Sequence, residues 1–267
     1  MGFFRVTLGT IFTKVGLVVL KMGVGVLTAR LLGLAGRGLF YSVVQFSGLT
    51  ATMYSLSLGE GVIYNIGKSK LRKPSLAALS SVYTIVASLV VLPIVATVFL
   101  VYGERIAETI PVSLWPVVLV LIPGMVFEYL VYSSFKAMKK FAISNILSLV
   151  SRGISLVAVA VGLFFWSESV EVALYSYATA LYVNTAIYGF MVFRLVSFQW
   201  ELDWKGMYSS IKYGASVHIS TFLSEVEYRV DVFLLLFFLN AAAVGIYSIG
   251  VTLAQLLWYL SNSINTV

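Results

Sequence analysis

Long runs of apolar residues, separated by short polar segments, form the dominant pattern of the sequence. Each run is long enough to cross a membrane as a helix, because about 20 residues rising about 1.5 Å each cover a hydrocarbon core of about 30 Å. The predicted spans are residues 8–32, 39–63, 76–101, 112–135, 142–166, 170–193, 213–239 and 242–262. The pattern therefore predicts an all-α, polytopic integral membrane protein with about eight transmembrane helices.

The composition agrees with a membrane environment. Apolar residues make up 60% of the chain, charged residues 11%, and the mean hydropathy is +0.97. A water-soluble domain of this length could not bury so much apolar surface. The chain has no cysteine, so cysteine usage gives no information on its redox compartment.

Lysine and arginine gather in every second loop of this pattern. Loops 64–75, 136–141 and 194–212 are basic, and the loops between them on the opposite side carry most of the acidic loop residues. The first loop on that opposite side is an exception, because it contains the basic residue Arg37. Basic loops stay in the cytoplasm, so the asymmetry predicts a cytoplasmic N-terminus. It also accounts for most of the formal net charge of +7, and no nucleic-acid partner is expected.

Patterns of known catalytic and metal sites are incomplete in this sequence. The stretch GVIYNIGKS at 61–69 resembles a phosphate-binding Walker loop, but Val62 stands where that motif requires glycine. A single histidine without cysteine does not form a typical zinc site, and no serine lies in a G-x-S-x-G elbow. We therefore expect neither an enzyme nor a cofactor or metal.

Charged residues inside three of the spans are the main functional signal. A helical repeat of 100° per residue places them on polar stripes, and such charges need a protein-facing or wet environment. The stripes are Thr7, Thr10, Lys14, Lys21, Gly25 and Thr28 in the first span, Asn145, Ser148, Arg152 and Ser155 in the fifth, and Gly214, His218, Glu225 and Arg229 in the seventh. Glu227 and Asp231 fall on the opposite side of the seventh span.

Simpler roles remain open for several of these residues. Lys14 could extend to the inner interface, Arg152 could pair with Glu128 of the preceding span, and His218 could be a packing residue. The seventh span also has an alternative boundary, a single helix from Val230 to about residue 251 with the charges at the inner interface. We favour the longer helix because its charged positions share one face.

Two short segments six spans apart have related sequences. Residues 38–42 read GLFYS and residues 245–248 read GIYS, each near the start of a span. An even number of crossings returns the chain in the same orientation, so this pattern indicates a parallel repeat.

Four segments carry a resemblance to a known family. They are ARLLGLAGRGLFYS (29–42), LGEG (58–61), YGASVHISTFLSEVEYRVDVFLL (213–235) and VGIYSIGVTLAQLLW (244–258). Together they resemble the polysaccharide transporter family, the O-antigen and exopolysaccharide flippases, which share a superfamily with multidrug exporters. The resemblance implies translocation of undecaprenyl-pyrophosphate-linked oligosaccharides across the plasma membrane, in company with polysaccharide polymerase machinery.

The same resemblance implies two six-helix bundles around a cavity that opens to alternate sides. The chain would then comprise a complete first bundle at 1–197 and the start of a second at 198–267, either as a fragment or as one of two assembling copies; we expect a fragment. By position, Lys14, Lys21, Arg152 and Arg229 would contact the pyrophosphate. The family's loop motif matches Arg30, Gly33, Arg37 and Gly38 as gate or packing residues.

Charge chemistry favours the same substrate class. Lysine and arginine stabilise an anion that loses its hydration midway across, whereas multidrug cations require the opposite sign. Transport could be driven by the membrane potential, or by H⁺ or Na⁺ at Glu225, Asp231 or His218. A multidrug antiporter, a membrane-embedded polysaccharide-assembly enzyme and a purely structural subunit remain as alternatives.

Overall fold

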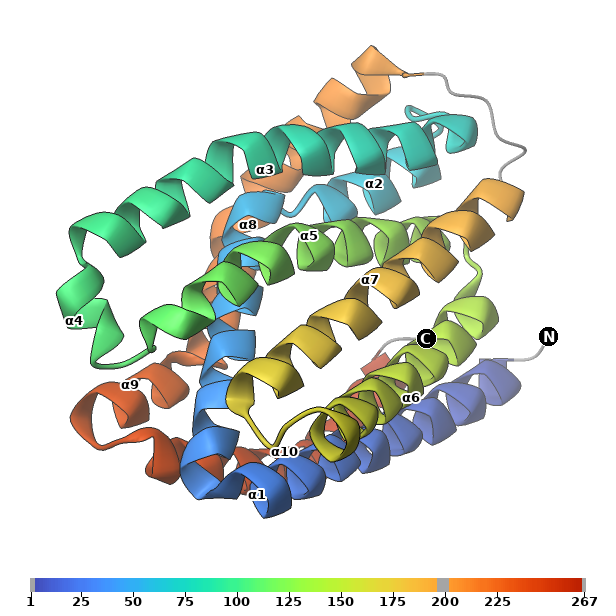
Figure 1. Ribbon diagram of the computed structural model, residues 1–267. Coiled ribbons are helices and arrows are strands. Elements are labelled where there is room, and N and C mark those ends of the chain that lie inside the picture. The colour runs from blue at the N-terminus through green and yellow to red at the C-terminus, as the bar shows by residue number, and fades with distance from the viewer. Residues whose placement is uncertain (1–2, 196–201, 266–267) are drawn as a thin grey trace. The chain divides into compact units, whose positions relative to one another are not determined.

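The chain is mostly helical in the residues that the structure, a computed structural model, describes: 3–195 and 202–265. No strand occurs in these ranges, which confirms the all-α prediction. The helices are α1 (Phe3–Ser55), α2 (Leu58–Gly67), α3 (Leu76–Val101), α4 (Gly103–Ala107), α5 (Trp115–Ala137), α6 (Phe141–Phe165), α7 (Val170–Leu195), α8 (Trp204–Glu227), α9 (Val230–Phe238) and α10 (Ala241–Asn265), as Figure 1 shows. Short 3₁₀ turns precede α3 and α5.

Left-handed backbone separates the first two predicted spans and interrupts the second of them. α1 contains the first span and most of the second, and it is broken at Gly33, where φ is 69°. The prediction of one continuous helix at 39–63 is wrong, because the helix breaks again at Leu56 and Ser57, with φ of 47° and 48°. Apolar residues continue across this break, so hydropathy gives no sign of it.

The seventh predicted span, 213–239, is also wrong in its bounds. Its helix begins earlier, at Trp204, because the Asp203 carboxylate caps it by accepting a hydrogen bond of 2.9 Å from the Gly206 N–H. It ends at Glu227, and α9 follows after a turn. The alternative helix from Val230 to residue 251 is wrong as well, because the chain turns again before α10.

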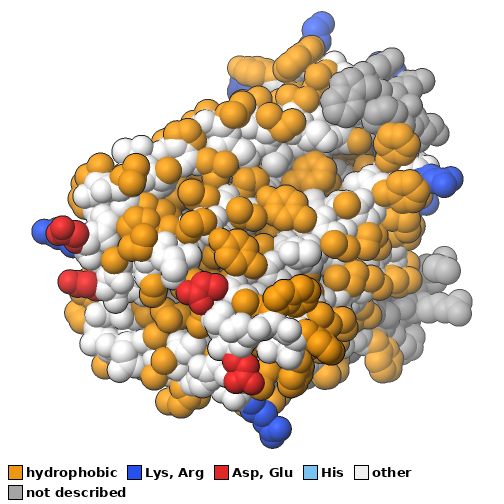
Figure 2. All heavy atoms as spheres, viewed as in Figure 1, with side chains coloured by type: hydrophobic (Ala, Val, Ile, Leu, Met, Phe, Trp, Pro, Cys, Tyr) orange, Lys and Arg blue, Asp and Glu red, His pale blue; other side chains and the backbone are white. Residues whose placement is uncertain are grey.

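Four segments of the described chain are long and apolar enough to cross a membrane on their own. They are Phe12–Ser55, Lys73–Val101, Val112–Ala137 and Phe141–Phe165. Figure 2 shows that hydrophobic side chains cover most of the face in view, as expected for helices that face lipid. The chain is therefore a polytopic membrane protein, although α7 and α8, which were predicted to span, are not among these four.

The chain divides into two compact units. Unit 1 comprises Met1–Val43, Phe141–Ala180 and Val232–Val267, and unit 2 comprises Val44–Lys140 and Leu181–Asp231. The predicted division into bundles at 1–197 and 198–267 stays a prediction, and its boundary lies outside the described residues.

Unit 1 is organised around close contacts of α1 with α6 and with α10. A Cβ on Gly16 would lie 2.8 Å from Leu149, and one on Gly23 would lie 3.2 Å from Leu156. The second contact lies seven residues after the first on both helices, so α1 and α6 run parallel. This direction is expected, because they correspond to the first and fifth predicted spans.

Unit 2 is organised around α2, which packs against α8 and α5 (Figure 1). Ser57 faces Gly214 and Gly61 faces Ser210, a pairing that defines an antiparallel register. A ring stack of Tyr64 on Tyr213, with centroids 4.0 Å apart, lies in the same helix pair. These small residues permit the close helix approach typical of membrane proteins.

Candidate functional site

The predicted cations of unit 1 lie on one parallel helix pair. Lys14 and Lys21 are half-buried on α1, and Arg152 is exposed on α6. The contacts of Gly16 with Leu149 and of Gly23 with Leu156 fix the relative height of the two helices. In this register Lys21 and Arg152 differ by only about two residues, or about 3 Å, along the helix axes. The structure therefore places these two cations at the same depth.

No carboxylate accompanies these cations on their own helices. α1, α6 and α10 contain no Asp or Glu, and the acidic residues Glu168 and Glu171 lie at the start of α7. The charged side chains of α1 and α6 are therefore all basic, and basic side chains attract anions.

Arg37, predicted as part of the loop motif, is almost fully buried, with 3% of its surface exposed. Its Nε donates a hydrogen bond of 3.2 Å to Ser248 Oγ, and its Nη1 donates one of 3.2 Å to Thr28 Oγ1. The guanidinium also lies 5.4 Å from the centroid of the Tyr41 ring. Arg37 thus connects both segments of α1 with α10.

The other loop-motif residues have different environments. Gly33 forms the break in α1, and Arg30 is exposed. Gly38 lies directly against the carbonyl oxygen of Ala241, so that no side chain could be placed there without a backbone shift. The structure brings Arg37 and Gly38 together against α10 and leaves Arg30 at the surface.

The contact between α1 and α10 is self-complementary. Gly38 lies against the Ala241 carbonyl oxygen, and Gly245 lies against the Leu34 carbonyl oxygen. Ala241 lies as many residues after Leu34 as Gly245 lies after Gly38, so Leu34 corresponds to Ala241 and Gly38 to Gly245 in the repeat. Each helix therefore uses the same two positions in the contact. A two-fold relation between repeats produces such a pattern. The parallel orientation of the repeat stays a prediction from the sequence.

Arg229 and Glu225 of the seventh-span stripe form an ion pair in unit 2. Arg229 Nη2 lies 2.6 Å from Glu225 Oε2, and their side chains are 19% and 36% exposed. Arg229 Nη1 also donates a hydrogen bond of 3.3 Å to the Gln45 carbonyl oxygen, and it lies over Gly48, where a Cβ would approach to 2.5 Å. The Arg229 guanidinium, in the turn after α8, is therefore held between Glu225 and α1.

The remaining members of the stripe also face the α1–α2 segment. His218 Nδ1 lies 3.0 Å from Ser57 Oγ, and a Cβ on Gly214 would lie 2.7 Å from the Leu56 carbonyl oxygen. Gly214 and His218 thus lie on a contact face of α8, at the break before α2, whereas Arg229 lies in the turn after α8. Asp231, half-buried, lies in the first turn of α9, apart from this face in sequence.

Sequence reasoning missed a buried polar cluster between α2 and α8. Asn65, with 0% exposure, donates to the Gly61 carbonyl oxygen at 3.0 Å and to Ser210 Oγ at 3.2 Å, and it accepts from Ser209 Oγ at 2.9 Å. The signal was a four-residue spacing of small and polar residues, Ser57-Gly61-Asn65 on one helix and Gly206-Ser210-Gly214 on the other.

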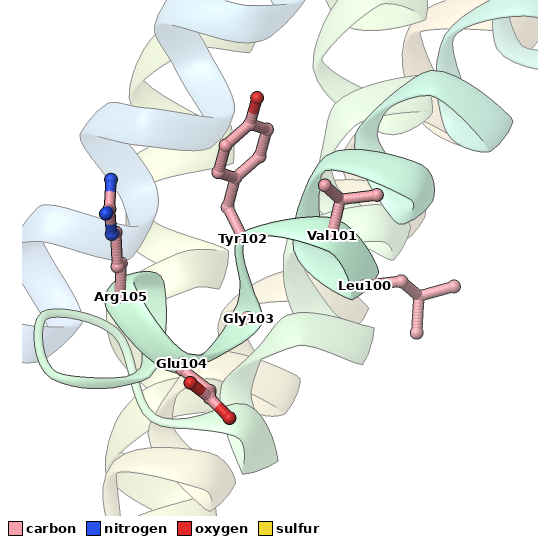
Figure 3. Close-up of a pocket in the computed structure, with 6 residues that line it drawn as sticks. All are labelled: Leu100, Val101, Tyr102, Gly103, Glu104 and Arg105. Carbon is pink, nitrogen blue, oxygen red and sulfur yellow. The ribbon is translucent and has the colours of Figure 1, made fainter.

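One open pocket, of about 410 Å³, lies at the turn from α3 to α4 (Figure 3). It is lined by Leu100–Arg105, with the Glu104 and Arg105 side chains pointing to opposite sides of α4, and by none of the predicted site residues. Among the residues whose placement is described, no group of three His, Cys, Asp or Glu side chains could bind a metal ion.

Solved structures with a similar fold are membrane transporters. A MATE protein in complex with Br-NRF has a TM-score of 0.68 and 15% identity over 95% of this chain and 63% of its own. A mutant of the Vibrio cholerae MATE transporter VcmN has a TM-score of 0.61 and 16% identity over 97% and 62%. A MOP superfamily transporter from Pyrococcus furiosus, described as having a binding pocket of reverse polarity that suggests a different function, has a TM-score of 0.52 and 14% identity over 97% and 66%.

The chain therefore shares the fold of these transporters, and it spans a little under two thirds of the length of the two MATE proteins. No curated protein matches the sequence. A family model described as polysaccharide biosynthesis protein matches residues 3–267, which is nearly the whole chain. The chain belongs to this polysaccharide biosynthesis protein family.

Proposed function

We propose that this chain forms part of a flippase that moves an undecaprenyl-pyrophosphate-linked oligosaccharide across the plasma membrane by alternating access. The family membership and the transporter fold support export across a membrane. The lipid-linked substrate, its polymerase partners and the plasma-membrane location belong to the proposal. A membrane-embedded assembly enzyme is less well supported, because the fold is shared with transporters.

The observation that carries the proposal is the charge of the α1–α6 pair. Lys21 and Arg152 lie at one depth, Lys14 precedes them on α1, and neither helix contains a carboxylate. Cations at membrane depth stabilise an anion that has lost its hydration, and guanidinium and ammonium groups form strong charge-assisted hydrogen bonds with phosphate oxygens. Pyrophosphate is the anionic group of the proposed substrate.

In this proposal Arg229 binds the anion only when it is released from Glu225. Its ion pair with Glu225 already compensates its charge, so an anion must compete with Glu225 for the guanidinium. Protonation of Glu225 would release Arg229 to the substrate, which gives one route for coupling to H⁺. Asp231 and His218 remain candidate coupling residues, and Na⁺ or the membrane potential are the other candidate driving forces.

A multidrug antiporter is the competing proposal. Its support is the fold likeness to MATE proteins and the presence of partly exposed Glu225 in unit 2. The two proposals differ in the charge of the substrate, which makes them separable by experiment.

The test is translocation in vesicles that contain the purified chain. A lipid-linked oligosaccharide with a fluorescent sugar is placed in one leaflet, and its arrival in the other is measured by quenching. Parallel vesicles receive a cationic dye. We expect translocation of the pyrophosphate lipid that is undiminished by excess dye, whereas dye transport without lipid translocation would favour the multidrug antiporter.

A further inference from the structure

Arg37 is a buried cation in unit 1 that contacts neutral groups. Its guanidinium donates hydrogen bonds to the hydroxyls of Ser248 and Thr28 and lies against the ring of Tyr41. Within residues 12–195 and 202–254, whose side chains are described, no carboxylate forms an ion pair with this guanidinium. A buried charge normally has a counter-ion, because hydroxyl groups compensate only part of its lost hydration.

The two hydroxyl groups act purely as acceptors toward Arg37. Thr28 Oγ1 donates its proton to the Val24 carbonyl oxygen at 2.7 Å, and Ser248 Oγ donates its proton to the Gly245 carbonyl oxygen at 2.8 Å. Both protons are thus directed to carbonyls of their own helices. The remaining lone pairs of the two hydroxyl oxygens accept the hydrogen bonds from Arg37. Neutral acceptors leave the positive charge of the guanidinium in place.

The contact between α1 and α10 conceals this charge. Ser248 lies one helical turn after Gly245, so the glycine contact that joins the two helices also brings Ser248 to Arg37. Gly38 and Gly245 allow the backbones to approach closely, and Arg37 precedes Gly38 in sequence. Movement of α10 away from α1 would remove Ser248 and expose the guanidinium.

We propose that Arg37 is a concealed site for a phosphate-type anion, which takes the place of Ser248 when α10 separates from α1. The guanidinium fork matches two phosphate oxygens, which compensate its charge better than neutral hydroxyls do. An anion that binds only the separated form must shift the equilibrium toward that form. The inference deepens the proposed function, since it assigns substrate pyrophosphate a role in opening this contact.

The test measures the α1–α10 separation directly. The chain has no cysteine, so the substitutions Ala35→Cys and Asn240→Cys, at exposed positions beside the contact, give a unique spin-label pair. Pulsed electron paramagnetic resonance of the full chain in lipid nanodiscs then reports the distance between the labels. Inorganic pyrophosphate is the probe, titrated at constant ionic strength with sulfate as the control anion.

Pyrophosphate should increase the population with the longer distance, with little effect of sulfate at equal ionic strength. Arg37→Gln should abolish the response, and Arg37→Lys, which keeps the charge but not the fork, should raise the required pyrophosphate concentration about tenfold. Arg105→Gln, an equal charge change at an exposed residue on α4, should respond as the unsubstituted chain does. Ser248→Ala should increase the longer-distance population without any anion.

No response of the unsubstituted chain, or an equal response of Arg37→Gln, would overturn the proposal. If Arg37→Gln does not fold, Arg37→Lys and Ser248→Ala decide the result by the same readout. The measurement uses no lipid-linked sugar, so its failure is distinct from failure of the flippase assay. Translocation could be confirmed while this anion response is absent, and the concealed site alone would then be wrong.

Discussion

At the scale of single residues, the charges of the seventh predicted span show how a membrane protein accommodates them. Arg229, in the turn after α8, is held by Glu225 at the end of that helix and by a main-chain carbonyl of α1, and Gly48 provides the space for the guanidinium. A partly exposed i,i+4 pair on a water-soluble helix contributes only about 0.3–0.5 kcal/mol. At membrane depth less water competes for the two groups, so the pair should contribute more.

A double-mutant cycle measures this contribution. We expect Glu225→Gln and Arg229→Gln to show a coupling free energy of about 0.5–1 kcal/mol in stability, because each single change leaves the other charge without its partner. Thermal or denaturant unfolding in a fixed detergent provides the four values. Additive effects of the two substitutions would show that the ion pair makes no net contribution.

Glycines at the α1–α10 contact give a second prediction at this scale. Gly245→Ala places a methyl group against the Leu34 carbonyl oxygen, and overpacking of this kind costs about 1–3 kcal/mol. Gly250→Ala, on the same helix with no atom within 4 Å of the new Cβ, should be neutral or stabilising by up to about 1 kcal/mol. Comparison of the two unfolding midpoints checks the contact, and equal midpoints would contradict it.

At the scale of elements, length and hydropathy predicted some helices well and their interruptions poorly. The span at 76–101 coincides with α3, and the spans at 142–166 and 170–193 lie within two residues of α6 and α7. The break at Gly33 lies in the predicted connection between the spans at 8–32 and 39–63. The breaks at Leu56–Ser57 and Tyr228–Arg229 were not predicted, because apolar residues continue across the first and the charges at the second fit a helical face. Tertiary contacts, such as that of Gly214 with the Leu56 carbonyl, determine where the backbone departs from helix.

The candidate site was predictable to a similar extent. Helical periodicity grouped Gly214 and His218 on one face of α8, and both contact the segment at Leu56–Ser57, whereas Arg229 lies in the turn after that helix. It could not show that Arg37 is buried, because this depends on a helix more than 200 residues away in the chain. The hydrogen-bonded cluster around Asn65 was not predicted either, because its serine partners are small and uncharged.

The packing of α2 on α8 gives the prediction at this scale. Gly61→Val places a branched side chain against the main chain of Ser210 and should lower stability by about 1–3 kcal/mol or more, with loss of the Asn65 hydrogen bonds. Gly67→Val is the matched control, because it lies at the end of the same helix with open space around it. Unfolding midpoints of both variants provide the measurement. If Gly61→Val is no worse than its control, the close register of these helices is wrong.

At the scale of the whole molecule, the sequence bias toward cations has two parts. Basic loops predict orientation, whereas Lys14, Lys21, Arg37 and Arg152 lie on helices of unit 1 and were not needed for that purpose. A membrane protein retains such residues at a free-energy cost, which indicates a functional role. In the proposed flippase, that role is to bind an anion within the membrane.

The membrane potential should therefore affect transport. Outward movement of an anion follows an inside-negative potential, which contributes about 2.3 kcal/mol per elementary charge at 100 mV. Translocation from the inner to the outer leaflet should accelerate severalfold when a potassium gradient with valinomycin makes the vesicle interior negative, and slow when the gradient is reversed. Equal rates under both gradients would show that no net charge moves in the rate-limiting step.

The central claim is that cations of the α1–α6 pair bind the pyrophosphate of the substrate. The most direct measurement is the initial translocation rate of lipid-linked oligosaccharide for the double variant Lys21→Gln and Arg152→Gln, beside the exposed-residue control Arg105→Gln with Lys139→Gln. The account predicts a loss of at least about tenfold in the first pair, as expected when charge-assisted contacts to phosphate are removed, and little change in the second. Equal rates for the two double variants, both folded, would contradict it.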